Sequence, residues 1–93
     1  MDVLRRDISA HPEEFRRGLH MAFPGLVAET ADGFSIDDGF ATMEITLVRG
    51  APRAIAAIRL PTIHVDIRFA RGTEAQQKAI LSRMDLAMHR GGG

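Results

Sequence analysis

Residues that could exchange protons or bind charged ligands recur at alternate positions in the second half of the chain. His64, Asp66 and Arg68 follow one another at intervals of two residues, which is the period of a β-strand and places all three on one face. A histidine beside an aspartate is a potential acid–base pair, and an arginine fork suits carboxylate or phosphate groups. The pattern predicts a polar sheet face with binding capacity.

Neighbouring segments add charge to the same predicted face. Glu44 lies in a second alternating segment and Arg59 in a third. Arginines and carboxylates on adjacent strands form cross-strand pairs worth roughly 0.2–1 kcal/mol each. Such pairing is by itself a sufficient reason for the charged residues of this face, and docking of a partner is the alternative. If a partner docks there, the predicted binding residues are Glu44, Arg59, His64, Asp66 and Arg68.

The remaining reactive residue types predict no catalytic or metal site. Zinc sites place histidines a few residues apart or combine them with cysteines, but no two histidines here are closer than nine residues, and there is no cysteine. The serines lack the G-x-S-x-G context of a nucleophile elbow. The acidic run from Glu29 to Glu44 contains the Asp-Gly pairs that hairpin turns require. We therefore predict no catalytic residue, no metal and no cofactor.

Two helices are predicted to flank the segments that carry the polar face. The first begins at Pro12, which suits the first helical position, and ends at Pro24-Gly25. The last begins after Thr73, which with Gln76 forms a capping-box pattern, and ends near Gly91. The first ten residues are ambiguous: Leu4 and Ile8 suit a short helix, but the segment is equally consistent with loose attachment.

Between the helices the hydrophobicity has a period of two, which predicts strands near 26–31, 34–36, 40–49, 53–60 and 62–70. Alternation in successive strands indicates that one sheet face is buried and the other is exposed to water. The apolar stripes of the helices supply the cover for the buried face. The predicted core is Phe15, Leu19, Phe23, Met43, Ile45, Leu47, Ile58, Ile63, Val65, Ile67, Phe69, Ile80, Met84 and Met88.

These elements predict an α+β fold with two layers. A helix, an antiparallel sheet of four or five strands and a second helix follow in order (α-β-β-β-β-α), with both helices on one sheet face. The whole chain, 1–93, is predicted to form a single small globular domain, with 1–10 as the segment that could be loosely attached and 91–93 as a flexible glycine tail.

Composition restricts the partners and the location. Twelve basic residues balance twelve acidic residues, which disfavours nucleic acid and an anionic membrane surface. No stretch approaches the roughly 20 apolar residues that span a bilayer, and the N-terminus has no apolar core of a signal peptide. We predict a cytoplasmic protein without a membrane partner. Homodimerisation is left open, because a short edge near Pro61 and the exposed sheet face could both pair.

The last four residues, Arg90-Gly91-Gly92-Gly93, resemble the glycine ending of ubiquitin-like sulfur carriers. The resemblance implies a carrier whose terminal carboxylate is adenylated and then thiolated. Those carriers have a β-grasp fold in which the tail follows a strand, whereas here it follows a predicted helix. A glycine that ends a helix explains the same residues.

The leading functional prediction is therefore a small, non-catalytic bacterial interaction or accessory module that uses the exposed polar sheet face to bind another protein. It follows from the zero net charge and from the lack of a catalytic constellation. A carrier of sulfur or acyl groups on the C-terminal glycine is the first alternative. A weak RNA-binding module is the second, although an RNA platform needs aromatic residues in its strands.

Overall fold

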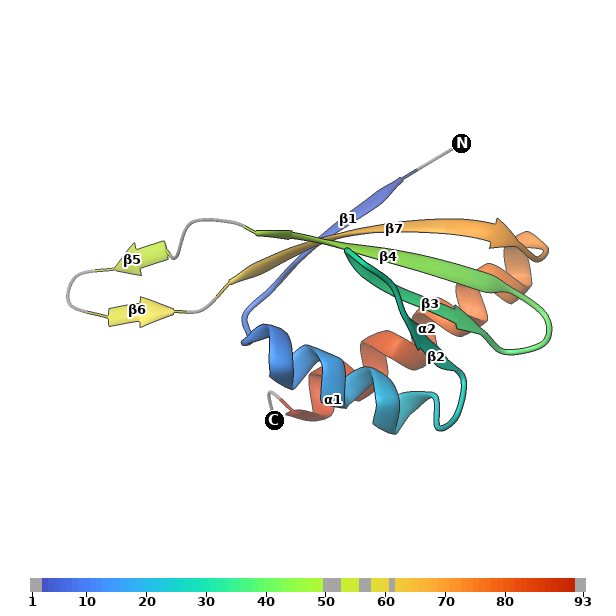
Figure 1. Ribbon diagram of the computed structural model, residues 1–93, viewed down its shortest axis with the longest axis horizontal. Helices are drawn as coiled ribbons and strands as arrows, with labels where there is room; N and C mark the ends of the chain where they lie inside the picture. Colours follow the sequence, from blue (N-terminus) through green and yellow to red (C-terminus); the bar gives the residue numbers. More distant parts are fainter. Residues whose placement is uncertain (1–2, 50–52, 56–57, 61, 92–93) are drawn as a thin grey trace.

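The structure is a computed structural model that describes residues 3–49, 53–55, 58–60 and 62–91, with side chains described for 3–48 and 62–88. Seven strands and two helices occupy this part of the chain (Figure 1). In chain order they are β1 (Leu4–Ile8), α1 (Pro12–Ala22), β2 (Val27–Glu29), β3 (Gly33–Asp37), β4 (Thr42–Arg49), β5 (Arg53–Ile55), β6 (Ile58–Leu60), β7 (Ile63–Arg71) and α2 (Glu74–Gly91).

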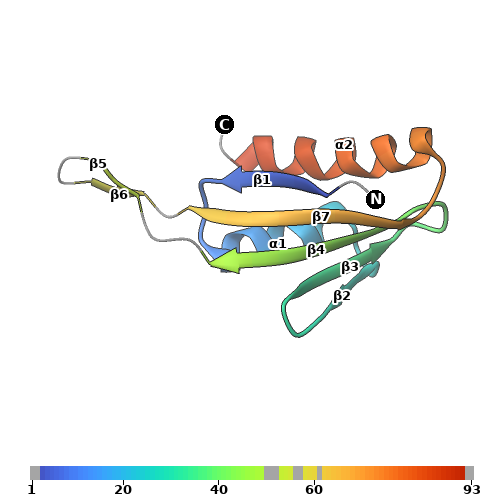
Figure 2. The same ribbon diagram turned by 90° about the horizontal axis from the view of Figure 1, so that it is seen from above.

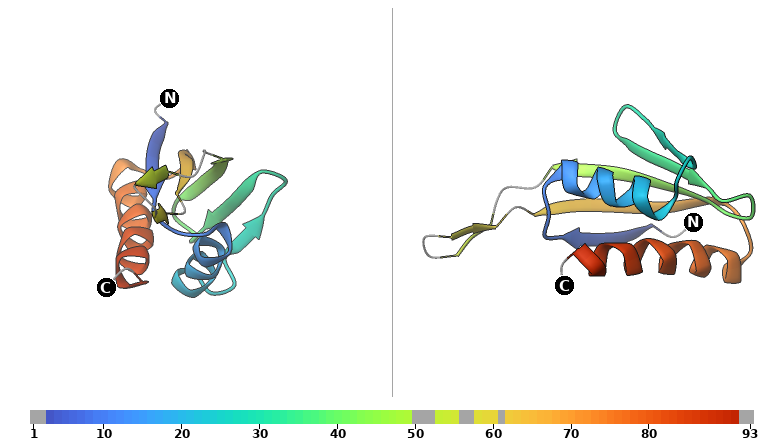
Figure 3. Two further views of the ribbon diagram at one scale, coloured as in Figure 1. Left: turned by 90° about the vertical axis from the view of Figure 1, so that its left-hand side faces the viewer. Right: turned by 90° about the horizontal axis from the view of Figure 1, so that it is seen from below.

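Five of the strands form one antiparallel sheet in the order β1-β7-β4-β3-β2. The chain meanders through β2, β3 and β4, and β7 then adds beside β4 (Figure 2). Both helices lie on the same side of this sheet, which is clearest in the end-on view of Figure 3. The predicted α+β class, the antiparallel sheet and the shared helix face are confirmed.

The two helices begin where the sequence predicts. At α1 the backbone N–H of His11 donates to the Glu14 carboxylate at 3.3 Å. At α2 the predicted capping box is formed: the Gln76 N–H donates to the Thr73 hydroxyl at 3.2 Å, and the Thr73 N–H donates to the Gln76 side chain at 2.9 Å. These bonds satisfy amide groups that have no partner inside a helix, so each helix has a defined start.

The core lies between the helices and the inner face of the sheet. Phe15 of α1 packs edge-on against Phe34 of β3, with ring centroids 5.9 Å apart. Ten predicted core residues are buried: Phe15, Leu19, Phe23, Met43, Ile45, Ile63, Val65, Ile67, Ile80 and Met84. Leu47, Phe69 and Met88 pack at its margin, and the side chain of Ile58 lies outside the described residues. The prediction omitted three members, which are Phe34, Ile36 and Ala41.

The N-terminal segment corrects one expectation. Leu4–Ile8 is a strand and not a short helix; it pairs with β7 from Leu4 opposite Ile67 to Ile8 opposite Ile63. Arg6 falls on the helix side of this strand and bonds Asp85 of α2 at 3.2 Å. A charged residue at an inward position interrupts the apolar alternation, which is why the sequence does not read as a strand.

A second correction concerns residues 53–60, which the sequence predicts to be one strand of the main sheet. The structure instead has two short strands, β5 and β6, which pair with each other in a separate two-stranded sheet. They lie beyond the ends of β4 and β7 and project away from the two helices (Figures 1 and 2). We call this β5–β6 hairpin the arm. Pro61, predicted to mark a break or an edge, lies outside the described residues.

Candidate functional site

The sheet has an outer face, opposite the helices, and the register of the strands places the polar residues there. Glu44 of β4 lies between Ser35 of β3 and Arg68 of β7, and Thr46 lies between Gly33 and Asp66. The described residues of the outer face are Arg5, Asp7, Ala28, Gly33, Ser35, Asp37, Thr42, Glu44, Thr46, Val48, His64, Asp66, Arg68 and Arg71.

Four of the five predicted binding residues share this face. Glu44 and Arg68 are exposed, whereas His64 and Asp66 are half-buried. Arg59 does not join them, because its backbone belongs to β6 in the separate two-stranded sheet. The Arg59 side chain lies outside the described residues.

Strand β1 supplies partners that the sequence did not predict. The Arg5 guanidinium grips both carboxylate oxygens of Asp66, with Nε 2.8 Å from Oδ1 and Nη2 3.3 Å from Oδ2. This hydrogen bonding, with the positive charge behind it, lowers the pKa of Asp66 below the usual aspartate range. The Arg5 guanidinium therefore favours the ionised form of the Asp66 carboxylate.

His64 is also paired across the strands. Its Nδ1 shares a hydrogen bond with Asp7 Oδ1 of β1, so the expected pairing of His64 with Asp66 on the same strand is replaced by one with Asp7. The Nδ1 atom of the His64 ring is therefore already engaged in a hydrogen bond with Asp7. His64 and Asp66 of β7 are therefore both engaged in holding β1 against β7.

A third ion pair, between Arg71 and Asp37, lies at the end of the outer face next to the β3–β4 turn. Arg71 donates to Asp37 at 3.0 Å, and the Thr42 hydroxyl donates to the other oxygen of the same carboxylate at 3.1 Å. The backbone N–H of Gly39 also donates to Asp37, and it is the main cause of the lowered pKa of Asp37. Asp38 likewise accepts from backbone N–H groups, first that of Ala41, which lowers its pKa. These carboxylates shape the β3–β4 turn.

Glu44 and Arg68 differ from these paired groups. They are opposite each other in the register of β4 and β7. Among the side chains described, every other charged group on the outer face has an ion-pair partner, but neither Glu44 nor Arg68 forms an ion pair or a side-chain hydrogen bond. Two exposed, opposite charges are therefore available side by side at the centre of the sheet.

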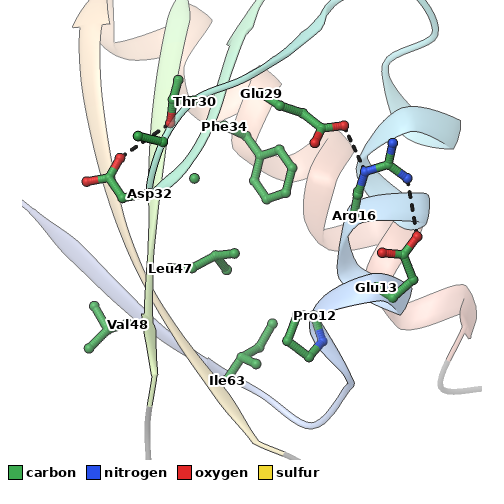
Figure 4. Close-up of a pocket in the computed structure, with 12 residues that line it drawn as sticks. Pro12, Glu13, Arg16, Glu29, Thr30, Asp32, Phe34, Leu47, Val48 and Ile63 are labelled. Carbon is green, nitrogen blue, oxygen red and sulfur yellow. Dashed lines mark hydrogen bonds and ion pairs between the residues drawn. The ribbon is translucent and has the colours of Figure 1, made fainter.

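The helix side of the molecule contains a separate concavity, which we call the helix-side groove. It has a volume of about 360 Å³ and lies between the start of α1, the β2–β3 turn and the region where β4 ends and β7 begins. Figure 4 shows Phe34, Leu47 and Ile63 along its wall and Pro12 across from them. The apolar side chains of this groove come from β3, β4, β7 and the start of α1.

Charged residues line one margin of the helix-side groove. Arg16 lies between two carboxylates: its Nε is 2.7 Å from Glu29 Oε2 and its Nη1 is 3.2 Å from Glu13 Oε1. His20 Nε2 is 3.1 Å from the same Glu29 oxygen. Hydrogen bonding from His20, and then from Arg16, lowers the pKa of Glu29. Arg16 and His20 thus anchor α1 to β2.

Within residues 3–48 and 62–88, no three histidine or acidic residues converge as metal ligands. The helix ends at Gly91, and Gly92 and Gly93 of the predicted tail lie outside the described residues. No helix in the described ranges is long and apolar enough to cross a membrane.

Comparison of the chain with protein-family models, curated proteins and solved structures gives no significant match. The outer face and the helix-side groove are therefore the two surfaces of the described residues on which a function can be based.

Proposed function

We propose that this chain is a small, non-catalytic interaction module that binds another protein through the outer face of its sheet. The single observation that supports the proposal is the state of Glu44 and Arg68. They are the two exposed charges at the centre of the face that have no ion-pair partner among the described residues, while the charges around them are paired.

Binding a partner costs less free energy for charges that have no ion-pair partner than for charges that are already paired. An exposed ion pair contributes at most about 1 kcal/mol, and charges that are already paired lose those bonds when they turn to a partner. Glu44 and Arg68 lose no such bond. The side chains around them are restrained by cross-strand bonds, so less conformational entropy is lost on binding. A partner that presents a basic group beside an acidic group fits this centre.

The charge of the face favours a protein over RNA. The outer face carries three described arginines and four described carboxylates, so positive charge is not in excess. They are Arg5, Arg68 and Arg71, and Asp7, Asp37, Glu44 and Asp66. RNA binding depends on an excess of positive charge and on stacking aromatics. No described aromatic side chain lies within the strands of this face; Phe40, which is 65% exposed, lies in the β3–β4 turn.

Site-specific photo-crosslinking in cells of the native host tests this proposal. A benzophenone amino acid at Thr46, on the outer face, is expected to give a defined adduct with one protein. The same group at Lys78, which is exposed on α2, serves as the matched control and is expected to give none. Identical adducts from both positions, or no adduct from Thr46, would overturn the proposal.

The role of the charge pair is tested in the same cells. Glu44→Arg alone places two positive groups opposite each other and is expected to abolish the adduct. The double variant, Glu44→Arg with Arg68→Glu, keeps two opposite charges side by side but exchanges their positions. Loss of the adduct in this variant therefore reflects altered binding and not repulsion between the two side chains within the fold. Far-UV circular dichroism checks that each variant is folded. Adduct formation unaffected by either variant would contradict binding through this centre.

A further inference from the structure

The two unpaired charges of the outer face make that face complementary to itself. Glu44 and Arg68 are opposite each other in the register of β4 and β7, and opposite residues of an antiparallel pair lie about 5 Å apart. A two-fold axis above the outer face, running along the strands midway between β4 and β7, exchanges these positions in a second copy. Glu44 then faces Arg68 of the second copy, and Arg68 faces its Glu44, as an isologous contact requires.

This contact brings four charges of alternating sign together without breaking an existing bond. In the described part of the chain neither Glu44 nor Arg68 forms an ion pair or a side-chain hydrogen bond. The same axis sets Thr46 against Asp66 of the second copy, because these residues are also register partners. A hydroxyl donor thus meets a carboxylate that stays bound to Arg5 of its own chain.

A concavity beside Glu44 provides room for the incoming guanidinium. It has a volume of about 200 Å³. Its lining includes hydroxyl groups and carboxylates, which belong to Thr30, Asp32, Ser35, Glu44 and Thr46. Asp32 is exposed, accepts a hydrogen bond from the Thr30 hydroxyl at 3.4 Å and has no ion pair with a described side chain. Arg68 of the same chain does not line this concavity, so a guanidinium fork from a second copy fits beside the two carboxylates.

The two halves of the outer face also differ in the length of their side chains. Arg5 and Asp7 are the outer residues of β1 that pair with β7, whereas Ala28 and Ser35 occupy the outer positions in the middle of the β2–β3 hairpin. The two-fold axis lays β1 of one copy over β3 of the other. Long side chains therefore meet short ones on both sides of the axis, which favours close approach of the two faces.

From these observations we propose that a second copy of this chain occupies the outer face when no other protein does, in a two-fold dimer centred on Glu44 and Arg68. This inference rests on the proposed function, because it concerns the same face and supplies its regulation. The other protein must displace the second copy, since both use the same two charges. The protein thus masks its own docking surface.

Sedimentation equilibrium of the full chain tests the dimer. The wild-type protein is expected to dimerise reversibly. Glu44→Arg gathers four positive groups at the axis and Arg68→Glu gathers four negative groups, so each should raise the dissociation constant on the order of a hundredfold. An equimolar mixture of the two variants places positive groups against negative groups and is expected to form a heterodimer, which also shows that both variants are folded.

The double variant Glu44→Arg with Arg68→Glu separates this inference from the proposed function. It keeps the alternation of charge about the axis and is expected to dimerise with itself, whereas its photo-adduct with another protein is expected to be lost. A wild-type dimer without any adduct to another protein would overturn the proposed function alone. Such an adduct without a wild-type dimer would overturn the self-masking alone.

The matched control reverses an exposed pair on α2, on the other side of the sheet. Glu74→Lys with Lys78→Glu, whose charges are 3.4 Å apart, should leave the dissociation constant unchanged. Three results would overturn the proposal: a wild-type chain that is monomeric up to about 1 mM, a dimer that Glu44→Arg and Arg68→Glu leave equally tight, or a mixture of these two variants that stays monomeric.

Discussion

The β2–β3 hairpin and the β5–β6 arm are both short antiparallel hairpins, but they differ in what lies beside them. β3 pairs along its whole length with β4, from Gly33 opposite Thr46 to Asp37 opposite Thr42. Its Phe34 and Ile36 are buried under the helices. β5 and β6 have no such neighbour among the described strands. The difference shows that a third strand and a covering helix, more than strand-forming residues, integrate a hairpin into a core.

The largest expected effect is at Phe34. Replacing Phe34, which is 5% exposed and packs on Phe15, with alanine is expected to lower the free energy of unfolding by about 3–5 kcal/mol. Urea denaturation measures the change. A loss below about 1 kcal/mol would show that the β2–β3 hairpin depends as little on the core as a free hairpin does.

A smaller but substantial effect is expected at Gly33. A Cβ on this residue would lie 1.8 Å from the carbonyl oxygen of Ile45, so Gly33→Ala must separate β3 from β4. We expect a loss of about 2–3 kcal/mol. Gly39→Ala is the control: it has open space but φ of +93°, and should cost only the roughly 1–2 kcal/mol of left-handed backbone. Equal losses in the two variants would exclude a steric origin.

Removing the arm should have little effect on the body. Arg49 and Ile63 are register partners, so replacing residues 50–62 with Asn-Gly joins β4 and β7 by a tight type I′ turn. We expect the free energy of unfolding to change by less than about 1 kcal/mol, measured by urea denaturation. A loss comparable to that of Phe34→Ala would mean that the arm belongs to the core.

The smallest effect concerns the attachment of β1, an edge strand held partly by charge. Arg5→Ala should raise the pKa of Asp66 toward the ordinary aspartate value of about 3.9. Because the pKa of Asp66 is lowered in the folded state, the pair stabilises the fold above the unfolded pKa, and this contribution is lost as the pH falls through the folded pKa. Carboxyl ¹³C NMR titration measures both pKa values; an unchanged Asp66 would contradict the pairing.

The sequence predicted the structure best in segments where a single periodicity of hydrophobic residues dominates. In β4 and β7 the alternation of Met43, Glu44 and Ile45, and of Val65, Asp66 and Ile67, correctly separated the buried from the exposed face. These strands lie in the middle of the sheet, where an error of one residue would bury charge. The alternation therefore reflects a strong physical constraint.

The sequence failed where a contact between distant segments decided the structure. Arg6 points inward because Asp85, 79 residues away, accepts its hydrogen bond, and no local pattern contains that information. The sequence at residues 56–57 is Ala-Ala, which gives no turn signal between β5 and β6. The candidate site inherited both errors: Asp7 and Arg5 were missed as partners of His64 and Asp66, and Arg59 was assigned to the main sheet.

The position of β1 in the sheet also determines the order in which the strands can assemble during folding. Among the described elements, Leu4–Ile8 is synthesised first, yet its hydrogen-bonding partner is β7, which is synthesised next to last. The meander of β2, β3 and β4 needs only contacts between neighbours in the sequence, so it is able to form early, whereas the edge at β7 stays open until the chain has closed a long loop. The outer face is therefore assembled last, because Arg5 and Asp7 reach Asp66 and His64 only at that final step.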